Sequence, residues 1–232
     1  MLNPGEIIEY VKACGLWNLL KANIGKYIFL HTRRIVSIIT YKDPLPEPKA
    51  YQKLLAAITI RKGTLADARD LNRMMKKHHL WRSVGELRQW IEKGRFLFVA
   101  VHKGEIIGYV CVCREIPSRH SIFGKAIRLK PDDAYGVHAF VVPEYRGKMV
   151  YSTLGLKMGR DLRAAGIKRL VVTLDPLNFS VRTANRRRGM REVAEIEILK
   201  VLFFTRTKVL WVKPEAVDLF VGKVGIEAAS EN

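Results

Sequence analysis

The sequence is poor in cysteine and in acidic residues, and both shortages exclude classes of protein. Its 232 residues include three cysteines, Cys14, Cys111 and Cys113, which are too few for a disulfide framework and lack a second pair at zinc spacing. We therefore expect reduced thiols, no metal site and a cytoplasmic setting. Only 22 Asp and Glu oppose 41 Lys and Arg, and the net charge of +19 favours polyanionic partners such as nucleic acid, anionic lipid or phosphorylated ligands.

Long apolar runs are also missing. No stretch approaches the roughly 20 residues needed to span a bilayer. The N-terminal segment carries Glu6 and Glu9 and shows no pattern of a secretory signal. With 48% hydrophobic residues, the chain can still bury a sizeable core. The length predicts one domain of catalytic size with an extension.

Three alternating prolines within residues 43–48 mark the clearest boundary in the chain. Proline fixes its own φ angle and biases the preceding residue to an extended conformation, so this stretch predicts a stiff linker. We expect residues 1–50 to form a basic amphipathic helical extension with this linker. Residues 51–213 would then form the main domain, and residues 214–232 a C-terminal tail.

The N-terminal extension combines helical periodicity with positive charge. Apolar side chains recur at helical spacing over residues 1–42, which predicts one or two helices. Residues 10–42 contain six basic residues and no acidic one. A basic amphipathic helix over residues 7–42 could bind an anionic membrane surface, at the inner face of the membrane. A helix packed on the main domain, or an arm that forms a homodimer, is the alternative.

Beyond the linker, the patterns of apolar residues alternate between strands and helices. We expect strands at 58–61, 96–101, 106–114, 134–142 and 168–174, helices at 64–79, 84–92, 149–165 and 179–188, and one or two strands within 190–204. Hairpins followed by β–α–β units predict an α/β (α+β) fold with a mixed central β-sheet flanked by helices.

A basic turn follows the strand expected at 134–142. Arg146, Gly147 and Lys148 precede a helix that begins near Val150. The first N–H groups of a helix have no partner within the helix, and together with the helix dipole they favour a phosphate group. This turn therefore predicts a phosphate site. A helix start with solvated basic side chains is the alternative.

Three stretches in order resemble the GCN5-related N-acetyltransferases (GNAT) across about residues 58–205. They are ITIRKGTLADA from Ile58, FVAVHKGEIIGYV from Phe98, and FVVPEYRGK from Phe140, the last followed by DPLN from Asp175 and by Gly189 and Met190. The resemblance implies the acyl-CoA N-acyltransferase (GNAT) fold and acetyl-CoA or another acyl-CoA as co-substrate. It also implies direct attack of an acceptor amine on the thioester without a metal. An acyl-carrier protein is a further candidate donor because such an acidic partner would suit the basic chain.

The resemblance also implies which residues bind CoA. Backbone groups of one strand would hold the pantetheine arm, at Ala139, Phe140 and Val141. The turn and the helix start would hold the pyrophosphate, at Arg146, Gly147, Lys148, Met149, Val150 and Tyr151. The asparagine that follows the next strand in the family is Asn178. Met149 and Tyr151 stand where the family pattern has glycine or another small residue.

Two further positions concern catalysis. Asn185 stands where many members of the family carry a tyrosine that protonates the leaving thiolate. An amide cannot donate a proton at neutral pH, so the thiolate would leave unaided or through water. His138 is the candidate general base, since a histidine pKa of ~6.5 suits proton transfer near neutral pH. A half-buried strand histidine is the alternative, and Glu115, Asp132 and Asp133 are other candidates for the base.

The leading hypothesis is an acyltransferase that moves an acyl group from CoA to an amine of an anionic or membrane-associated acceptor. Acetyl is the acyl group that we expect. The alternative is a catalytically inactive GNAT-like binding or regulatory domain with an arm that binds membranes or polyanions, as the residues at Met149, Tyr151 and Asn185 suggest. Nucleic-acid binding is disfavoured because no helix-turn-helix, zinc or aromatic-platform signature is visible.

Overall fold

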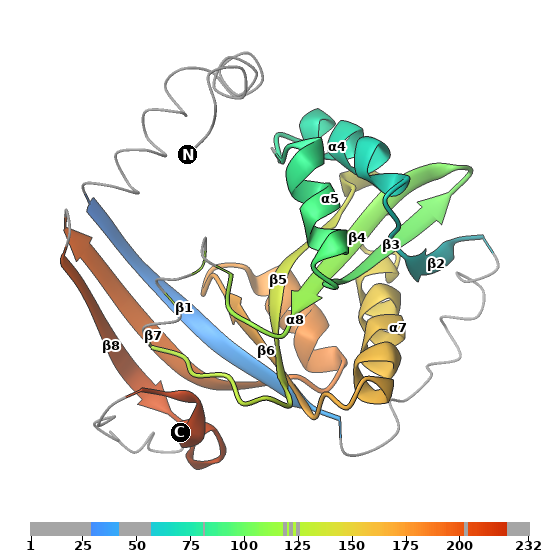
Figure 1. The fold of residues 1–232 in the computed structure, drawn as a ribbon. Coiled ribbons are helices and arrows are strands. Elements are labelled where there is room, and N and C mark those ends of the chain that lie inside the picture. The colour runs from blue at the N-terminus through green and yellow to red at the C-terminus, as the bar shows by residue number, and fades with distance from the viewer. Residues whose placement is uncertain are drawn as a thin grey trace.

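The structure, a computed structural model, describes residues 29–41, 57–80, 82–117, 120, 123, 126–201 and 204–221. These residues form an eight-stranded sheet in the order β2-β3-β4-β5-β6-β1-β7-β8, flanked by helices (Figure 1). The β5–β6 pair is parallel and the other neighbouring pairs are antiparallel. The predicted mixed central sheet flanked by helices is thus confirmed.

The strands are β1 (Phe29–Thr40), β2 (Thr59–Lys62), β3 (Phe96–His102), β4 (Glu105–Cys113), β5 (Asp133–Val141), β6 (Arg169–Leu174), β7 (Arg191–Val201) and β8 (Phe204–Val212). The helices are α4 (Asp67–Lys77), α5 (Val84–Glu92), α7 (Val150–Ala164) and α8 (Phe179–Arg187), with short 3-10 helices η2 (Pro143–Tyr145) and η3 (Pro214–Leu219). No helix within the described ranges is both long and apolar enough to cross a membrane.

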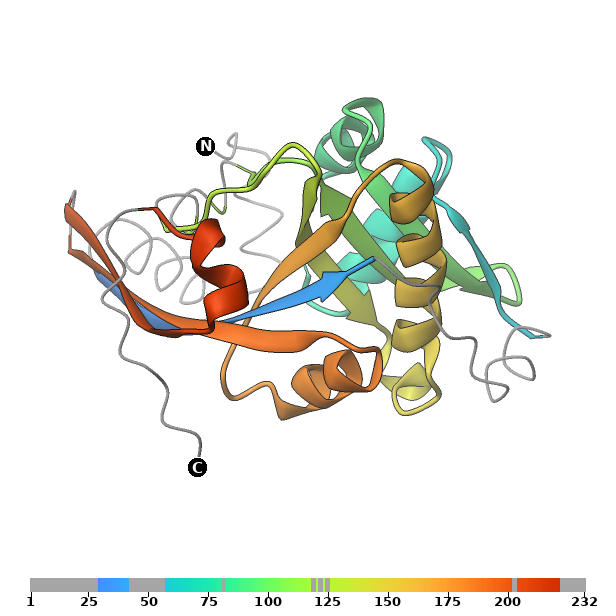
Figure 2. The same cartoon turned by 90° about the horizontal axis from the view of Figure 1, so that it is seen from below.

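Three apolar clusters hold these elements together. One face of α7, including Leu154 and Leu162, packs on β3, β4 and β5. The α4–α5 pair covers β3 and β4 through a separate cluster that includes Leu71 and Trp90. A third cluster joins β1 and β7 to η3, which lies against this half of the sheet (Figure 2).

Residues 29–40 form a strand, so the helix expected over residues 1–42 is wrong for this part. Strand β1 pairs antiparallel with β6 on one side and with β7 on the other. The residues from Ile35 to Ile38 are all buried, because an interior strand of a sheet covered on both faces loses the alternation of apolar and polar side chains. Its β-branched side chains favour a strand, whereas the isoleucine spacing is compatible with a helix.

The position of β1 changes the expected domain organisation. Helix α8 connects β6 to β7, and β1 lies between these two strands. Residues 29–40 therefore belong to the main sheet and not to a separate extension over residues 1–50. The expected linker, and the expected membrane-binding helix before residue 29, lie outside the described residues. The expected tail begins with η3, in which Ala216 and Leu219 are buried.

A buried ion pair joins the starts of β5 and β6 to the C-terminal segment. The guanidinium of Arg169 donates to both carboxylate oxygens of Asp133, at 2.8 and 2.7 Å, and to those of Asp218, at 3.0 and 3.1 Å. The side chain of Asp133 is 2% exposed and that of Asp218 is 36% exposed. The guanidinium holds the pKa of Asp218 below its usual range. This pairing fixes the parallel register from which β5 and β6 extend.

We predict that Asp133→Asn lowers the free energy of unfolding by about 3 kcal/mol, because it leaves the Arg169 charge buried without its main partner. The matched change Asp218→Asn removes a more exposed carboxylate and should cost at most about 1 kcal/mol. Urea unfolding of the two variants measures the difference. Equal losses of unfolding free energy in the two variants would show that the buried Arg169–Asp133 pair contributes no more than the exposed one.

Candidate active site

Strands β5 and β6 separate halfway along their length, and this separation opens a cleft. They pair from Asp133 opposite Arg169 to Gly136 opposite Val172, and β5 then continues against β4 alone. Val137 is an extra residue in the register between β5 and β4, a bulge of the kind that bends a strand. A cleft of about 870 Å³ follows, with walls from β5, β6, α7 and α8.

The cleft side of β5 offers backbone hydrogen-bond donors. The N–H of Val142 donates to the carbonyl of Ile107 at 2.9 Å, so strand alternation turns the N–H groups of Val141 and Ala139 to the opposite side. Within the part of the chain that the structure describes, no strand pairs with β5 there, because β6 is paired only as far as Gly136. These two N–H groups can therefore bind an extended ligand arm that lies along β5.

The N-terminus of α7 opens onto the same cleft. The first bond within the helix runs from the N–H of Thr153 to the carbonyl of Met149, at 3.0 Å, and Met149 gives no side-chain cap. The N–H groups of Val150, Tyr151 and Ser152 thus precede the hydrogen-bonded turns, and all three residues line the cleft. With the helix dipole and the side chain of Arg146, this end of the cleft suits a pyrophosphate. Lys148 does not line the cleft, and its Nζ lies 5.3 Å from the centroid of the Tyr145 ring.

The turn before α7 uses two left-handed residues. Gly147 has φ 73° and Met149 has φ 64°. Glycine adopts this conformation at no steric cost, whereas a side chain makes it unfavourable by about 1 kcal/mol or more. The glycine expected from the family pattern at position 149 therefore matches the backbone found there, and Met149 occupies the position under strain.

Tyr151 and Asn185, the two other departures from the family pattern, are in contact. The hydroxyl of Tyr151 donates to Oδ1 of Asn185 at 3.0 Å. Asn185 is 1% exposed and is not part of the cleft wall, whereas Tyr151 is. The phenol thus lies between the cleft and the buried amide.

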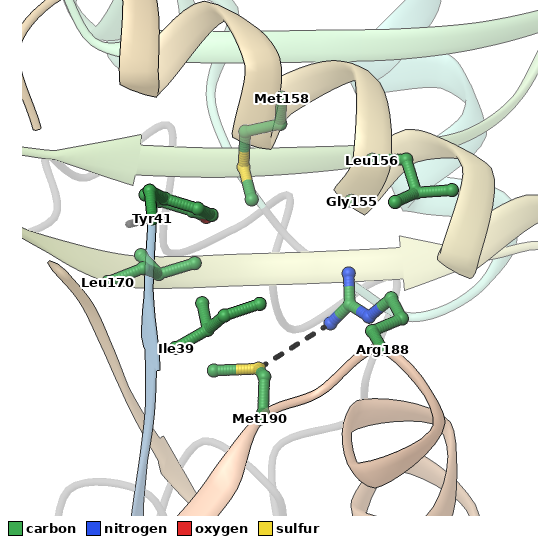
Figure 3. Close-up of a pocket in the computed structure, with 8 residues that line it drawn as sticks. All are labelled: Ile39, Tyr41, Gly155, Leu156, Met158, Leu170, Arg188 and Met190. Atoms are coloured by element: carbon green, nitrogen blue, oxygen red, sulfur yellow. Dashed lines mark hydrogen bonds between the residues drawn. The ribbon is translucent and has the colours of Figure 1, made fainter. Parts of the chain in front are cut away.

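Arg188, at the end of α8, completes this group of side chains. Its Nη2 also donates to Oδ1 of Asn185, and its Cζ lies 4.4 Å from the centroid of the Tyr151 ring. Figure 3 shows the guanidinium reaching toward Gly155 of α7 and toward Met190. A Cβ at Gly155 would lie 1.5 Å from Nη1 of Arg188. Sequence reasoning missed the role of Arg188, although a glycine inside a helix is a signal of such a close approach.

Asn178 caps α8. Its side-chain oxygen accepts from the N–H of Val181 at 3.2 Å, which is the standard role of asparagine at a helix start. The residue also lines the cleft. The structure therefore places Asn178 near the expected cofactor and gives it a local structural task as well.

His138 lines the cleft from β5. Its Nδ1 lies 2.5 Å from the hydroxyl of Tyr109, and the two rings stack with centroids 5.5 Å apart. Burial, with smaller contributions from Arg82 and His120, lowers the pKa of His138 to about 4. The imidazole is therefore neutral at pH 7.

The other candidates for the base are less well placed. Asp133 is held in the buried pair with Arg169. Asp132 forms an ion pair with Lys168 at 3.0 Å, and this partner lowers the pKa of Asp132. Glu115 is exposed. None of these three carboxylates lines the cleft, so His138 is the candidate that the structure brings to it.

The described residues contain no group of three or more His, Cys, Asp or Glu side chains that could hold a metal ion. Cys111 and Cys113 are both buried and free. Burial raises the pKa of the Cys111 thiol to about 12, so this thiol, which lines the cleft, stays protonated and unreactive at neutral pH.

Comparison with known proteins agrees with this geometry. The model of the acetyltransferase (GNAT) family matches residues 66–190. A GCN5-related glucosamine N-acetyltransferase region of a fungal multi-domain β-N-acetylglucosaminidase has a TM-score of 0.56 at 15% identity, over 78% of this chain and 22% of that chain. A Drosophila protein has a TM-score of 0.51 at 14% identity, over 81% of this chain and 58% of that chain. Among curated proteins, none matches the sequence.

At such low identity the solved structures show the fold alone, and this chain spans less than two thirds of the length of both. The family model is more specific, because its match over residues 66–190 covers more than half of the chain and includes β5, the basic turn and α7. The chain belongs to the acetyltransferase (GNAT) family.

Proposed function

We propose that this protein transfers an acyl group from CoA to an amine by direct attack of the amine on the thioester. Acetyl is the leading candidate for this acyl group. One observation carries the proposal: the free N–H groups of β5 and the uncapped start of α7 open onto one cleft. An acyl-CoA needs both, since its pantetheine arm pairs with an extended backbone and its pyrophosphate needs converging N–H donors.

The backbone of β5 would also assist the chemistry. The N–H groups of Ala139 and Val141 lie where the arm of the ligand would run, and a donor aimed at the thioester oxygen stabilises the negative charge that develops as the amine attacks. His138 lies on the same strand, and its neutral ring can accept the proton that the amine loses. With a pKa of about 4, the ring would pass this proton on to solvent rather than hold it.

Charge in the cleft bears on the acceptor. The residues that line it include Arg146, Arg187 and Arg188 and no Asp or Glu. A polycationic amine would find no carboxylate on these walls, whereas phosphate or carboxylate groups would be attracted. We therefore propose an acceptor amine on a molecule of neutral or negative charge.

The second candidate function is a domain that binds an acyl-CoA or a related ligand without turnover. The strained Met149 and the phenol of Tyr151 at the cleft wall favour it. Both functions require ligand binding, and only the first requires release of free CoA from an acyl-CoA. A thiol-detection assay with a panel of amines separates the two.

Titration calorimetry with acyl-CoAs from acetyl to dodecanoyl tests the shared requirement, and we expect saturable binding. Lys148→Gln removes a charge next to the start of α7 and should weaken binding about threefold to tenfold, which corresponds to about 0.7–1.4 kcal/mol. Lys157→Gln, the same change on the outer part of the same helix, should leave affinity unchanged. Absence of saturable binding for every chain length would reject the CoA-dependent function.

Replacing Met149 by glycine should stabilise the protein. The change removes a side chain from a residue with φ 64°, which relieves about 1 kcal/mol of backbone strain and raises the melting temperature by about 2–4 °C. Met149→Ala removes the same long side chain but keeps the Cβ, so it should give no such gain. Scanning calorimetry of the two variants decides whether the conformation, and not the loss of the methionine side chain, is the cause.

The buried imidazole predicts a pH dependence of stability. The unfolded chain binds a proton at His138 below about pH 6.5, whereas the folded protein does so only below about pH 4. Stability is therefore complete above pH 6.5, and on the order of 2–3 kcal/mol is lost as the pH falls to 4. Urea unfolding of His138→Asn should show a flatter profile over this range. Tyr109→Phe, which keeps the imidazole buried, should retain the wild-type slope.

A further inference from the structure

We propose that Tyr151 is the proton donor to the leaving thiolate, so that α7 supplies the hydroxyl that the resemblance would place at Asn185 on α8. The inference rests on the proposed acyl transfer. Its basis is the contact between these two side chains, with the Tyr151 hydroxyl 3.0 Å from Oδ1 of Asn185.

The phenol of Tyr151 is part of the cleft wall. Tyr151 lies in the first turn of α7, and its ring packs against the cluster beneath the helix. Among the described residues, Tyr145 and Tyr151 are the phenols that line the cleft, and that of Tyr145 is bonded to Nδ1 of His102 at 2.8 Å. Tyr151 is thus the cleft-lining phenol that contacts α8, through Asn185.

Asn185 and Arg188 act as positioning residues for this phenol. Oδ1 of Asn185 accepts from both Tyr151 and Arg188. When the Tyr151 hydroxyl turns to a ligand sulfur, Oδ1 therefore keeps one donor and is not left unsatisfied. The Arg188 guanidinium, 4.4 Å from the ring centroid, holds the ring in place by a cation–π contact.

The glycine at position 155 makes this arrangement possible. A side chain there would meet Nη1 of Arg188 at 1.5 Å, and that nitrogen is the far end of a flexible side chain. Gly155→Ala should consequently displace the guanidinium of Arg188 from the ring while the Tyr151 side chain itself stays unchanged. It provides a way to remove the support of Tyr151 while the fold is retained, because alanine favours a helix more than glycine does.

The step balances without any further reactant. The acceptor nitrogen forms a bond to the thioester carbon, and the carbon–sulfur bond breaks. The sulfur takes the proton of the Tyr151 hydroxyl. The phenolate then regains a proton from solvent, which has received the proton lost by the amine.

The test uses free CoA and needs no acceptor. A hydroxyl that donates to the sulfur stabilises the thiolate and lowers the thiol pKa of bound CoA. We expect Tyr151→Phe to bind CoA as the wild type does but to raise the bound thiol pKa by about one unit, a tenfold change in the ionisation constant. Thiolate absorbance in the ultraviolet follows the titration, after subtraction of the protein alone.

Two variants complete the experiment. Gly155→Ala should raise the thiol pKa by a smaller amount, and the exchange Tyr151→Gly with Asn185→Tyr should restore the wild-type value. An unchanged thiol pKa in Tyr151→Phe overturns the proposal. If the same variant also binds CoA more tightly, the phenol obstructs the ligand instead of donating to it. Failure of the wild-type protein to bind CoA rejects the proposed function, and this inference with it.

Discussion

The separation of β5 from β6 beyond Gly136 is the constraint on which the rest of the site depends. A paired strand has no free backbone groups, so a cleft with N–H donors along β5 can exist only where the parallel neighbour turns away. The buried Arg169–Asp133 pair fixes the strands at one end, and the bulge at Val137 bends β5 at the other. Because α7 follows β5 after a short turn, its N-terminus necessarily lies at the mouth of the same opening.

Local signals predicted most of the elements around the cleft. The helix expected at 84–92 is α5, and the hydroxyl of Ser83 before it accepts from the N–H of Glu86. The strands expected at 96–101 and 106–114 are β3 and β4, which pair as a hairpin. The strand β1 was missed because its neighbours are distant in the sequence: Ile38 pairs with Val171 on one side and with Arg191 on the other. A helix and a strand buried on both faces present similar runs of apolar residues, and only these long-range partners distinguish them.

The candidate site was predictable to the extent that it is built from consecutive residues. The basic turn and the strand before it are consecutive in the sequence, and the structure brings Arg146, Gly147 and the strand to the cleft, although Lys148 does not line it. The arrangement of Tyr151, Asn185 and Arg188 is not local, since it requires α7 and α8 to be packed side by side. Taken singly, Asn185 indicates a missing proton donor, and the sequence indicates no role for Arg188. Their shared hydrogen bonds give both a role.

Two of the departures from the family pattern, Tyr151 and Asn185, are in direct contact, so a change at one bears on the other. A phenol at position 151 would be a defect if the α8 position still carried its own tyrosine, because two large side chains would then compete for one place. With asparagine at 185, the shorter side chain leaves room and accepts the hydrogen bond of the longer one. Gly155 and Arg188 fit the same arrangement, since the glycine admits the cation that lies over the ring. Tyr151, Gly155, Asn185 and Arg188 thus form one connected set of contacts, and the double change Tyr151→Gly with Asn185→Tyr is the one most directly linked to it.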